Sequence, residues 1–340
     1  NHREEIEMAD SKKRILTGDR PTGNLHLGHY VGSLANRVKL QKEYDSFILI
    51  ADVQALTTHW EKDENLAENI FAIALDYLSV GIDPEISTIL IQSMVPELFE
   101  LTMYFSLYTS VNVLRHNPTI KSEAAQHGFK DMTYGFLGYP VSQAADIAIF
   151  KAHLVPVGED QIPHLELARK IVRRFNDLYR PVLVEPDTLV GEVPRLVGLD
   201  GKTKMSKSLN NAIFLSDSSD TIKSKIRSAV TDPARIRKND PGHPDICTIF
   251  QYQQIFNKNE ISEIETNCRQ GSIGCVDCKN RLFVQLEQLL APMRERRSKF
   301  ANNMPLVRDI LFDGTSKARA VAEDTMREVR EAMKINYFNQ

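Results

Sequence analysis

The sequence has no apolar run close to the roughly 18 residues that a helix needs to cross a bilayer. Its first residues lack the apolar core of a secretory signal peptide, and neither an internal repeat nor a low-complexity stretch occurs. These absences exclude a membrane-spanning chain and a repeat protein, so we expect a soluble, cytoplasmic protein with no membrane partner. We do not assign the acidic residues 1–7, which precede Met8, to the fold.

Cysteine is scarce, yet all four cysteines fall in one window with the pattern Cys247-x20-Cys268-x6-Cys275-x2-Cys278. In a cytosolic chain this clustering argues against structural disulfides and for thiolate ligands of a metal. Four thiolates suit either zinc or an iron–sulfur cluster, and the spacing alone does not choose between them. Four unrelated buried thiols are the remaining alternative.

The chain as a whole has no excess of positive charge, since its formal net charge is −3. Residues 1–200 hold 19 Lys and Arg against 28 Asp and Glu, whereas residues 201–340 hold 23 against 17. The C-terminal part is therefore the candidate partner of RNA phosphates, with solvated helix faces as the alternative. Its basic clusters consist of Lys223, Lys225, Arg227, Arg235, Arg237 and Lys238, and of Arg294, Arg296, Arg297 and Lys299.

The first part of the chain alternates short β-rich runs with helical patterns, which predicts an α/β fold with a doubly wound parallel sheet covered on both faces. In such a sheet ligands bind at the carboxyl ends of the strands. The predicted strands are Arg14–Thr17, Ser46–Ala51, Ser87–Gln92 and Leu154–Val157, and the clearest helices between them are 26–42 and 64–79.

After residue 208 the pattern is helical throughout, with predicted helices at 218–230, 249–267, 278–300, 304–311 and 315–334. We therefore expect an α/β domain at 12–215 and a smaller all-helical domain at 216–316. We expect a final segment, 317–338, to return to the α/β domain through an apolar stripe. That stripe comprises Ala318, Val321, Ala322, Thr325, Met326, Val329 and Met333.

Two motifs carry the clearest chemistry. The pentapeptide Lys204-Met205-Ser206-Lys207-Ser208 places two lysines on a short segment, which suits a polyphosphate that departs during a reaction. Near the N-terminus, Pro21-Thr22-Gly23 and His26-Leu27-Gly28-His29 have the spacing of a strand-to-helix turn, with two imidazoles at a helix start where anions bind. A basic surface loop and two capping histidines are the alternative reading.

Two further segments complete the predicted site. Gly158-Glu159-Asp160-Gln161 follows the strand Leu154–Val157, where a carboxylate suits ribose hydroxyls. Tyr139, Gln143 and Asp146 fall on one helical face. An aspartate in an otherwise apolar stretch needs a hydrogen-bond donor, and an indole N–H is one candidate, with an internal arginine as the other.

The segments 204–208 and 21–29 resemble the two ATP-binding motifs of class I aminoacyl-tRNA synthetases, and we call them the two ATP motifs. From about Lys13 to Phe338, and most closely at 155–161 and 144–147, the chain resembles the bacterial tryptophanyl-tRNA synthetases. The resemblance implies a Rossmann-type catalytic domain, a helical anticodon-binding domain and a homodimer. It also implies a tryptophan–tRNA ligase that activates L-tryptophan with ATP and Mg²⁺ and transfers it to tRNA(Trp).

The resemblance also assigns residues to roles. The catalytic residues would be His26, His29, Lys204 and Lys207. ATP would contact Arg20, Pro21, Thr22, Gly28, His29, Gly158, Glu159, Asp160, Leu196, Lys204, Met205, Ser206, Lys207 and Ser208. Tryptophan would contact Gly18, Gln54, Tyr139, Gln143, Asp146 and Gln161, with Asp146 accepting from the indole N–H and with Tyr139 and Gln161 at the ammonium end.

The cysteine spacing is similar to that of a subset of these synthetases that carry a [4Fe–4S] cluster. The resemblance therefore favours iron–sulfur ligation by Cys247, Cys268, Cys275 and Cys278, with zinc as the alternative.

Two residues depart from the tryptophan pattern. Gln54 stands where many members have a histidine, and Gln143 stands where a methionine is common. The resulting Tyr-x3-Gln-x2-Asp resembles the tyrosyl-tRNA synthetase pattern, so tyrosine is the alternative substrate. A paralogue that binds RNA or senses oxidants without charging tRNA is the other alternative.

Overall fold

The computed structural model of the protein describes residues 12–60, 65–158, 161–190, 196–207 and 209–338. Its centre is a five-stranded parallel sheet with the order β3-β2-β1-β4-β5. The strands are β1 Arg14–Asp19, β2 Asp45–Ile50, β3 Ser87–Ile91, β4 Leu154–Val157 and β5 Asp187–Val190. The predicted parallel sheet and its first four strands are confirmed. The edge strand β5 was not predicted, because it is only four residues long and just two of them, Leu189 and Val190, are apolar.

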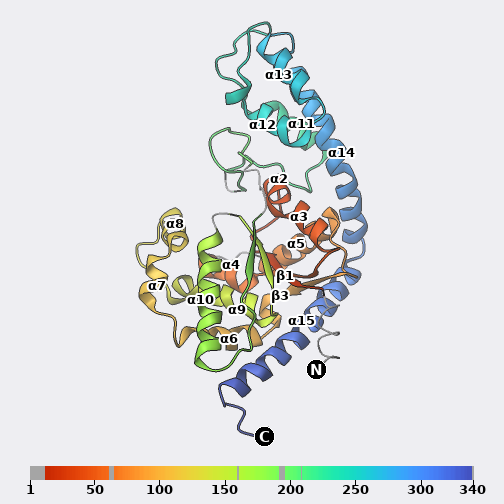
Figure 1. The fold of residues 1–340 in the computed structure, drawn as a ribbon. Coiled ribbons are helices and arrows are strands. Elements are labelled where there is room, and N and C mark those ends of the chain that lie inside the picture. The colour runs from red at the N-terminus through yellow and green to blue at the C-terminus, as the bar shows by residue number, and fades with distance from the viewer. Residues whose placement is uncertain (1–11, 61–64, 159–160, 191–195, 208, 339–340) are drawn as a thin grey trace.

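Helices cover both faces of this sheet (Figure 1). Those of the first part are α2 Leu27–His29, the π-helical turn η1 Tyr30–Leu34, α3 Ala35–Leu40, α4 Asp52–His59, α5 Leu66–Val80, η2 Gln92–Met94, α6 Glu97–Ser106, α7 Val111–His116, α8 Pro118–His127, α9 Tyr134–Ile149 and α10 Ile162–Leu178. The single helix predicted at 26–42 is thus continuous but contains a π-helical turn.

Both faces of the sheet are apolar, because alternate residues of β2 pack into two different cores. Phe47 and Leu49 pack into one core with side chains of α6, α9 and α10, and Ile48 and Ile50 pack into a second core with those of α5 and α14. A strand buried on both sides reads as a continuous apolar run, which is the pattern that predicted these strands.

The C-terminal part is helical, with α11 Ser219–Ser228, η4 Pro244–Ile246, α12 Thr248–Phe256, α13 Ile261–Arg269, α14 Cys275–Ala301 and α15 Met304–Ala332. In Figure 1, α14 runs from this helical region down the side of the part that contains the sheet, and α15 continues beneath the sheet. No helix among the described residues is both long and apolar enough to cross a membrane.

The prediction of two helices at 304–311 and 315–334 was wrong, because α15 is continuous through Gly314. A side chain at Gly314 would collide with the backbone carbonyl of Ile89 in β3. The neighbouring Thr315 is buried, and its hydroxyl accepts a hydrogen bond from the N–H of Ile91 at 3.2 Å. The glycine therefore lets the helix approach the sheet and does not end it.

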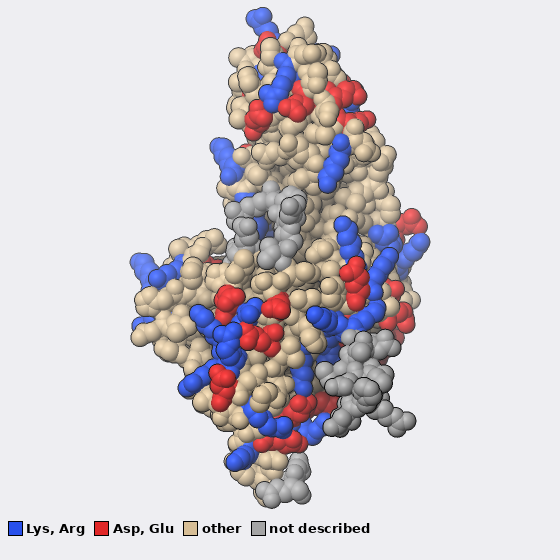
Figure 2. All heavy atoms as spheres, in the orientation of Figure 1, with Lys and Arg blue, Asp and Glu red and all other residues tan. Residues whose placement is uncertain are grey.

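The second basic cluster, expected to be available to RNA, is largely engaged within the chain. Arg297 forms an ion pair of 2.9 Å with the buried carboxylate of Asp76 on α5, and Arg296 donates to the carbonyl of Ser79 at 2.7 Å. Arg294 and Lys299 pair with glutamates of their own helix. On the face drawn in Figure 2, basic side chains lie among acidic ones and form no continuous patch.

Gly314→Ala tests the close approach of α15 to β3. Because the added methyl group would meet backbone atoms of Ile89, we expect it to lower the free energy of unfolding by about 1–3 kcal/mol. Thermal unfolding followed by circular dichroism measures the effect. Gly135→Ala in α9 is the matched control, because a side chain there meets no atom within 4 Å. Equal melting temperatures for the two variants would contradict this packing role.

Candidate functional site

The two ATP motifs, separated by some 180 residues in the sequence, are in contact at the carboxyl end of β1. The Lys207 ammonium donates to the carbonyl of Thr22 at 3.4 Å. Gly23 has a φ of +121°, and a side chain on it would collide with the Lys207 ammonium. The backbone conformation therefore favours glycine at this position, and a side chain there would displace the end of the flexible Lys207 side chain.

The lysine motif lies on the returning arm of a short hairpin, in which Val197 pairs with Lys204 in an antiparallel bridge. The buried side chain of Asn211 holds this hairpin. Its oxygen accepts from the N–H of Ser206 at 2.7 Å, and its amide donates to the carbonyl of Lys204 at 3.3 Å. Lys204 and Lys207 are exposed, whereas Met205 and Leu196 are buried in the same apolar core. Ser208 lies outside the described residues.

The two histidines have defined tautomers. The Nδ1 of His26 accepts from the N–H of Gly28 at 3.1 Å, and the Nδ1 of His29 accepts from the N–H of His26 at 3.2 Å. Burial, with His29 and Lys204 nearby, lowers the pKa of His26 to about 3. Burial also lowers the pKa of His29. Both rings are therefore neutral near pH 7 and carry their proton on Nε2, where each can donate a hydrogen bond to an anion.

A buried ion pair lies beside these rings. Arg37 contacts the Asp19 carboxylate at 2.6 Å, and the Tyr77 hydroxyl donates to the same oxygen at 2.7 Å. Arg37 also donates to the carbonyl of Gly18, a residue predicted to contact tryptophan, at 3.2 Å. This network leaves no local pattern in the sequence, because its members come from three separate elements.

Asp146 is buried on α9, and its partner is an amide and not the arginine considered as an alternative. The Gln92 amide nitrogen lies 3.0 and 2.9 Å from its two carboxylate oxygens. Burial raises the pKa of Asp146 to about 7, against the lowering effect of the Gln92 hydrogen bond and with a further rise from the Asp52 charge. The backbone N–H of Gln54, another predicted contact, donates to Gln92 Oε1 at 3.1 Å.

The remaining predicted contacts have mixed surroundings. The Tyr139 hydroxyl lies 2.8 Å from Nε2 of the buried His164. The Oε1 atom of Gln143 is buried and has no hydrogen-bond partner among the described residues. Arg20 lies 3.6 Å from Glu123 of α8.

The predicted contacts that follow β4 are only partly described. Gln161 is half-buried, and its N–H donates to the carbonyl of Gly158 at 3.0 Å. Glu159 and Asp160 lie outside the described residues.

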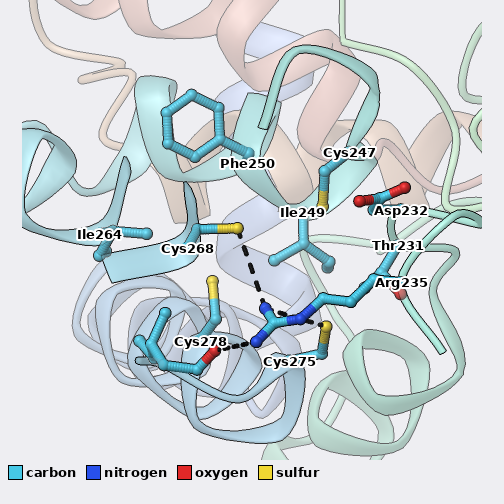
Figure 3. Close-up of a pocket in the computed structure, with 11 residues that line it drawn as sticks. Thr231, Asp232, Arg235, Cys247, Ile249, Phe250, Ile264, Cys268, Cys275 and Cys278 are labelled. Atoms are coloured by element: carbon cyan, nitrogen blue, oxygen red, sulfur yellow. Dashed lines mark hydrogen bonds between the residues drawn. The ribbon is translucent and has the colours of Figure 1, made fainter. Parts of the chain in front are cut away.

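All four cysteines line one pocket in the helical part (Figure 3). The Arg235 guanidinium extends between two of them, with Nη1 at 4.0 Å from Cys268 Sγ and 3.9 Å from Cys275 Sγ. The Gln253 amide lies 3.5 Å from Cys278 Sγ. Within the described part of the chain, no three metal-ligating side chains are close enough together to hold one metal ion.

Comparison with known proteins agrees with this site. The family of class I tRNA synthetases for tryptophan and tyrosine matches residues 8–291. The chain is 51% identical over 339 residues to a tryptophan–tRNA ligase of Lactococcus lactis, covering 96% of this chain and 99% of the relative. It is 50% identical over 337 residues to that of Clostridium longisporum, covering 97% and 99%. The chain belongs to the tryptophanyl-tRNA synthetases.

The fold of the synthetase agrees with this membership. The crystal structure of tryptophanyl-tRNA synthetase from Campylobacter jejuni, complexed with ADP and tryptophan, has a TM-score of 0.84 to this chain at 33% identity. The match covers 94% of this chain and 99% of that one. The Rossmann-type fold with a helical C-terminal part, expected from the sequence, is therefore confirmed.

The tautomers of the two histidines of the synthetase can be measured directly. In protein labelled with [¹⁵N]histidine, we expect His29 to give a neutral, Nε2-protonated resonance at pH 7, because burial lowers its pKa. We expect the same of His26 even at pH 6, because burial lowers its pKa to about 3. A free imidazole with a pKa near ~6.5 is mostly protonated at that pH. Assignment through the His26→Gln and His29→Gln variants identifies the two signals. A doubly protonated ring at either position would contradict the hydrogen-bond pattern.

Proposed function

We propose that the synthetase forms tryptophanyl-adenylate and pyrophosphate from L-tryptophan and ATP, and then transfers tryptophan to tRNA(Trp). The observation that carries this proposal is the contact between Lys207 and the Thr22–Gly23 turn, which joins both ATP motifs at one edge of the sheet. Asp146, buried on α9 at the carboxyl side of the same sheet, supplies the acceptor for an indole N–H. The named relatives disfavour the alternatives of tyrosine and of a non-charging paralogue.

In the activation step the tryptophan carboxylate attacks the α-phosphorus of ATP, which enters with Mg²⁺ as the substrate complex. The bond to the departing pyrophosphate breaks, and no covalent intermediate with the enzyme is needed. The protein therefore contributes positioning and stabilisation of charge. Lys204 and Lys207 are exposed cations that would face the growing charge of pyrophosphate. The neutral His26 and His29 would donate from Nε2 to the phosphate oxygens.

The rest of ATP would lie along the same edge. Gly28, whose missing side chain leaves room beside the His26 ring, would border the adenine together with Leu196 and Met205. Arg20, Pro21 and Thr22 would border the phosphates. Gly158, with Glu159 and Asp160, would reach the ribose, as carboxylates do in related nucleotide sites.

Tryptophan would bind with its ring towards Asp146 and its ammonium group towards Tyr139 and Gln161. Among the described residues Gln143 Oε1 has no hydrogen-bond partner, which supports this placement, because a buried acceptor needs a donor and an ammonium or indole group supplies one. Gln54 and Gly18 would border the same space.

Pyrophosphate exchange measured in parallel with tryptophan and with tyrosine tests the proposal. We expect exchange into ATP with L-tryptophan and charging of tRNA(Trp). Exchange that is equally fast with tyrosine would overturn the substrate assignment, and no exchange with any amino acid would overturn catalysis.

The pKa of Asp146 predicts a pH dependence of tryptophan binding. The ionised carboxylate accepts the indole N–H, and protonation removes this acceptor, so the affinity must fall as the pH falls through about 7. Tryptophan should bind roughly tenfold more weakly at pH 6 than at pH 8, as measured by calorimetry. Asp146→Asn should bind more weakly throughout and lose the pH dependence. A wild-type affinity that is constant over this range would contradict the assignment.

For the cysteines, we propose a [4Fe–4S] cluster. Four thiolates on one pocket are suitable ligands for iron or zinc, and they face the Arg235 cation and the Gln253 amide, which would oppose their charge. A side chain on Gly242 would lie 2.5 Å from the Cys268 sulfur, so the backbone leaves room at that sulfur. The sequence spacing Cys247-x20-Cys268-x6-Cys275-x2-Cys278 resembles that of the iron–sulfur subset of the family, and this resemblance is the reason for proposing a cluster and not a single zinc.

Anaerobic purification tests the choice of metal. We expect brown protein with broad absorbance near ~400 nm and about four irons per chain, and colourless protein after Cys275→Ser. Because the pocket lies far from the ATP motifs, amino acid activation should survive cysteine replacement better than tRNA charging. Colourless wild-type protein with one zinc per chain would decide for zinc.

The other expected partners follow from family membership and remain proposals. Residues 216–316 would contact the anticodon, with Arg237 and Lys238 as exposed cations beside the cysteine pocket, and 317–338 would return to the catalytic part. We propose that the synthetase is a cytoplasmic homodimer. The candidates for its interface are exposed apolar side chains on α6, on α7 and at the end of α6, namely Met103, Val111, Val113 and Leu107. Analytical ultracentrifugation would detect the dimer.

A further inference from the structure

Gln92 is a buried side chain that the proposed chemistry does not use. It follows β3 directly, at the carboxyl edge of the sheet, and is 1% exposed. Its Oε1 accepts from the backbone N–H of Gln54, and its amide nitrogen faces both oxygens of Asp146. These contacts determine the orientation of the amide. A flipped amide would set its oxygen against the carboxylate and its NH₂ group against an N–H.

The Gln92 amide holds the Asp146 carboxylate by hydrogen bonds and brings no positive charge to it. Among the described residues, the only hydrogen bonds to its carboxylate come from the Gln92 amide. In the part of the chain that the structure describes, the charged group that acts on it is Asp52 of α4, which repels it and which accepts a hydrogen bond from the N–H of Ser93 at 2.9 Å. A carboxylate has about four acceptor sites, so an amide that bridges both oxygens still leaves lone pairs for a further donor. The two residues that follow β3 thus hold the two aspartates in place, Gln92 through its side chain on Asp146 and Ser93 through its N–H on Asp52.

We propose that Gln92 is a positioning residue for substrate selectivity, which keeps the Asp146 carboxylate oriented towards the indole N–H of tryptophan. This inference rests on the role of Asp146 in the proposed function. Gln92 acts through Asp146 and does not contact the substrate. Its loss should therefore weaken the interaction with the ring N–H and leave the ATP site unchanged.

The experiment compares tryptophan with 3-benzothienyl-L-alanine, in which sulfur replaces the indole N–H. The ratio of their kcat/KM values in pyrophosphate exchange isolates the hydrogen bond to the ring. Gln92→Met keeps the side-chain volume but removes the amide, and we expect it to lower this ratio roughly tenfold, as loss of one buried hydrogen bond does. Gln92→Asn, whose shorter amide does not reach both carboxylate oxygens, should lower the ratio as well, and it serves if the methionine variant does not fold.

Gln41→Met is the matched control. Gln41 is also buried, donates to the carbonyl of Gly81 at 2.9 Å and accepts from the hydroxyl of Ser87 at 3.0 Å, far from Asp146. The same chemical change there should leave the selectivity ratio unaltered. In an Asp146→Ala background, Gln92→Met should cause no further loss, because its effect passes through Asp146.

The outcomes separate the two proposals. If wild-type enzyme does not prefer tryptophan over the sulfur analogue, the assignment of Asp146 fails and the inference fails with it. If wild-type enzyme prefers tryptophan but the Gln92 variants lose activity with both substrates in parallel, only the role of Gln92 is overturned. A further loss of selectivity in the Asp146→Ala background would mean that Gln92 contacts the ring itself, which also overturns the inference.

Discussion

The contact of the Lys207 ammonium with the turn at Thr22 and Gly23 is the interaction on which the proposed catalytic site depends. It joins a loop after the first strand to a hairpin near residue 200, and the φ of +121° at position 23 favours glycine there. The adjacent histidines are neutral, because burial and the Lys204 charge lower the pKa of His26. The exposed positive charges of the lysine motif, on a segment held by Asn211, therefore lie beside neutral rings and not beside charged imidazoles.

A second buried group connects this region to the C-terminal helices. Asp76 of α5 accepts from the backbone N–H of Leu25, just before the first histidine, at 2.8 Å. Its other oxygen pairs with Arg297 of α14 at 2.9 Å. A single buried carboxylate thus bonds both the ATP loop and the long helix that leads to the cysteine pocket. Displacement of α14 relative to α5 would have to break this ion pair or move Asp76 with it.

The features predictable from the sequence were those that depend on local pattern. Strands buried on both faces gave continuous apolar runs, and both ATP motifs lie on contiguous residues whose spacing is visible. Contacts between distant elements left no such signal. Gln92 ends an apolar strand and Asn211 follows an exposed turn, so nothing local indicates that one holds Asp146 and the other the lysine hairpin. Gly314 resembled a helix end because its close neighbour, Ile89, is over 200 residues away in the sequence. For the same reason Arg297 looked free to bind RNA.

The central claim is that Lys207 stabilises charge that develops on the departing pyrophosphate. Rapid-quench measurement of adenylate formation by Lys207→Ala, beside calorimetric binding of tryptophan, tests it most directly. We predict a rate about a hundredfold or more lower with unchanged tryptophan affinity, because the lost interaction belongs to the transition state. Lys202→Ala, an exposed lysine on the same hairpin, should leave both quantities unchanged. An unchanged rate with weakened tryptophan binding in Lys207→Ala would contradict the account.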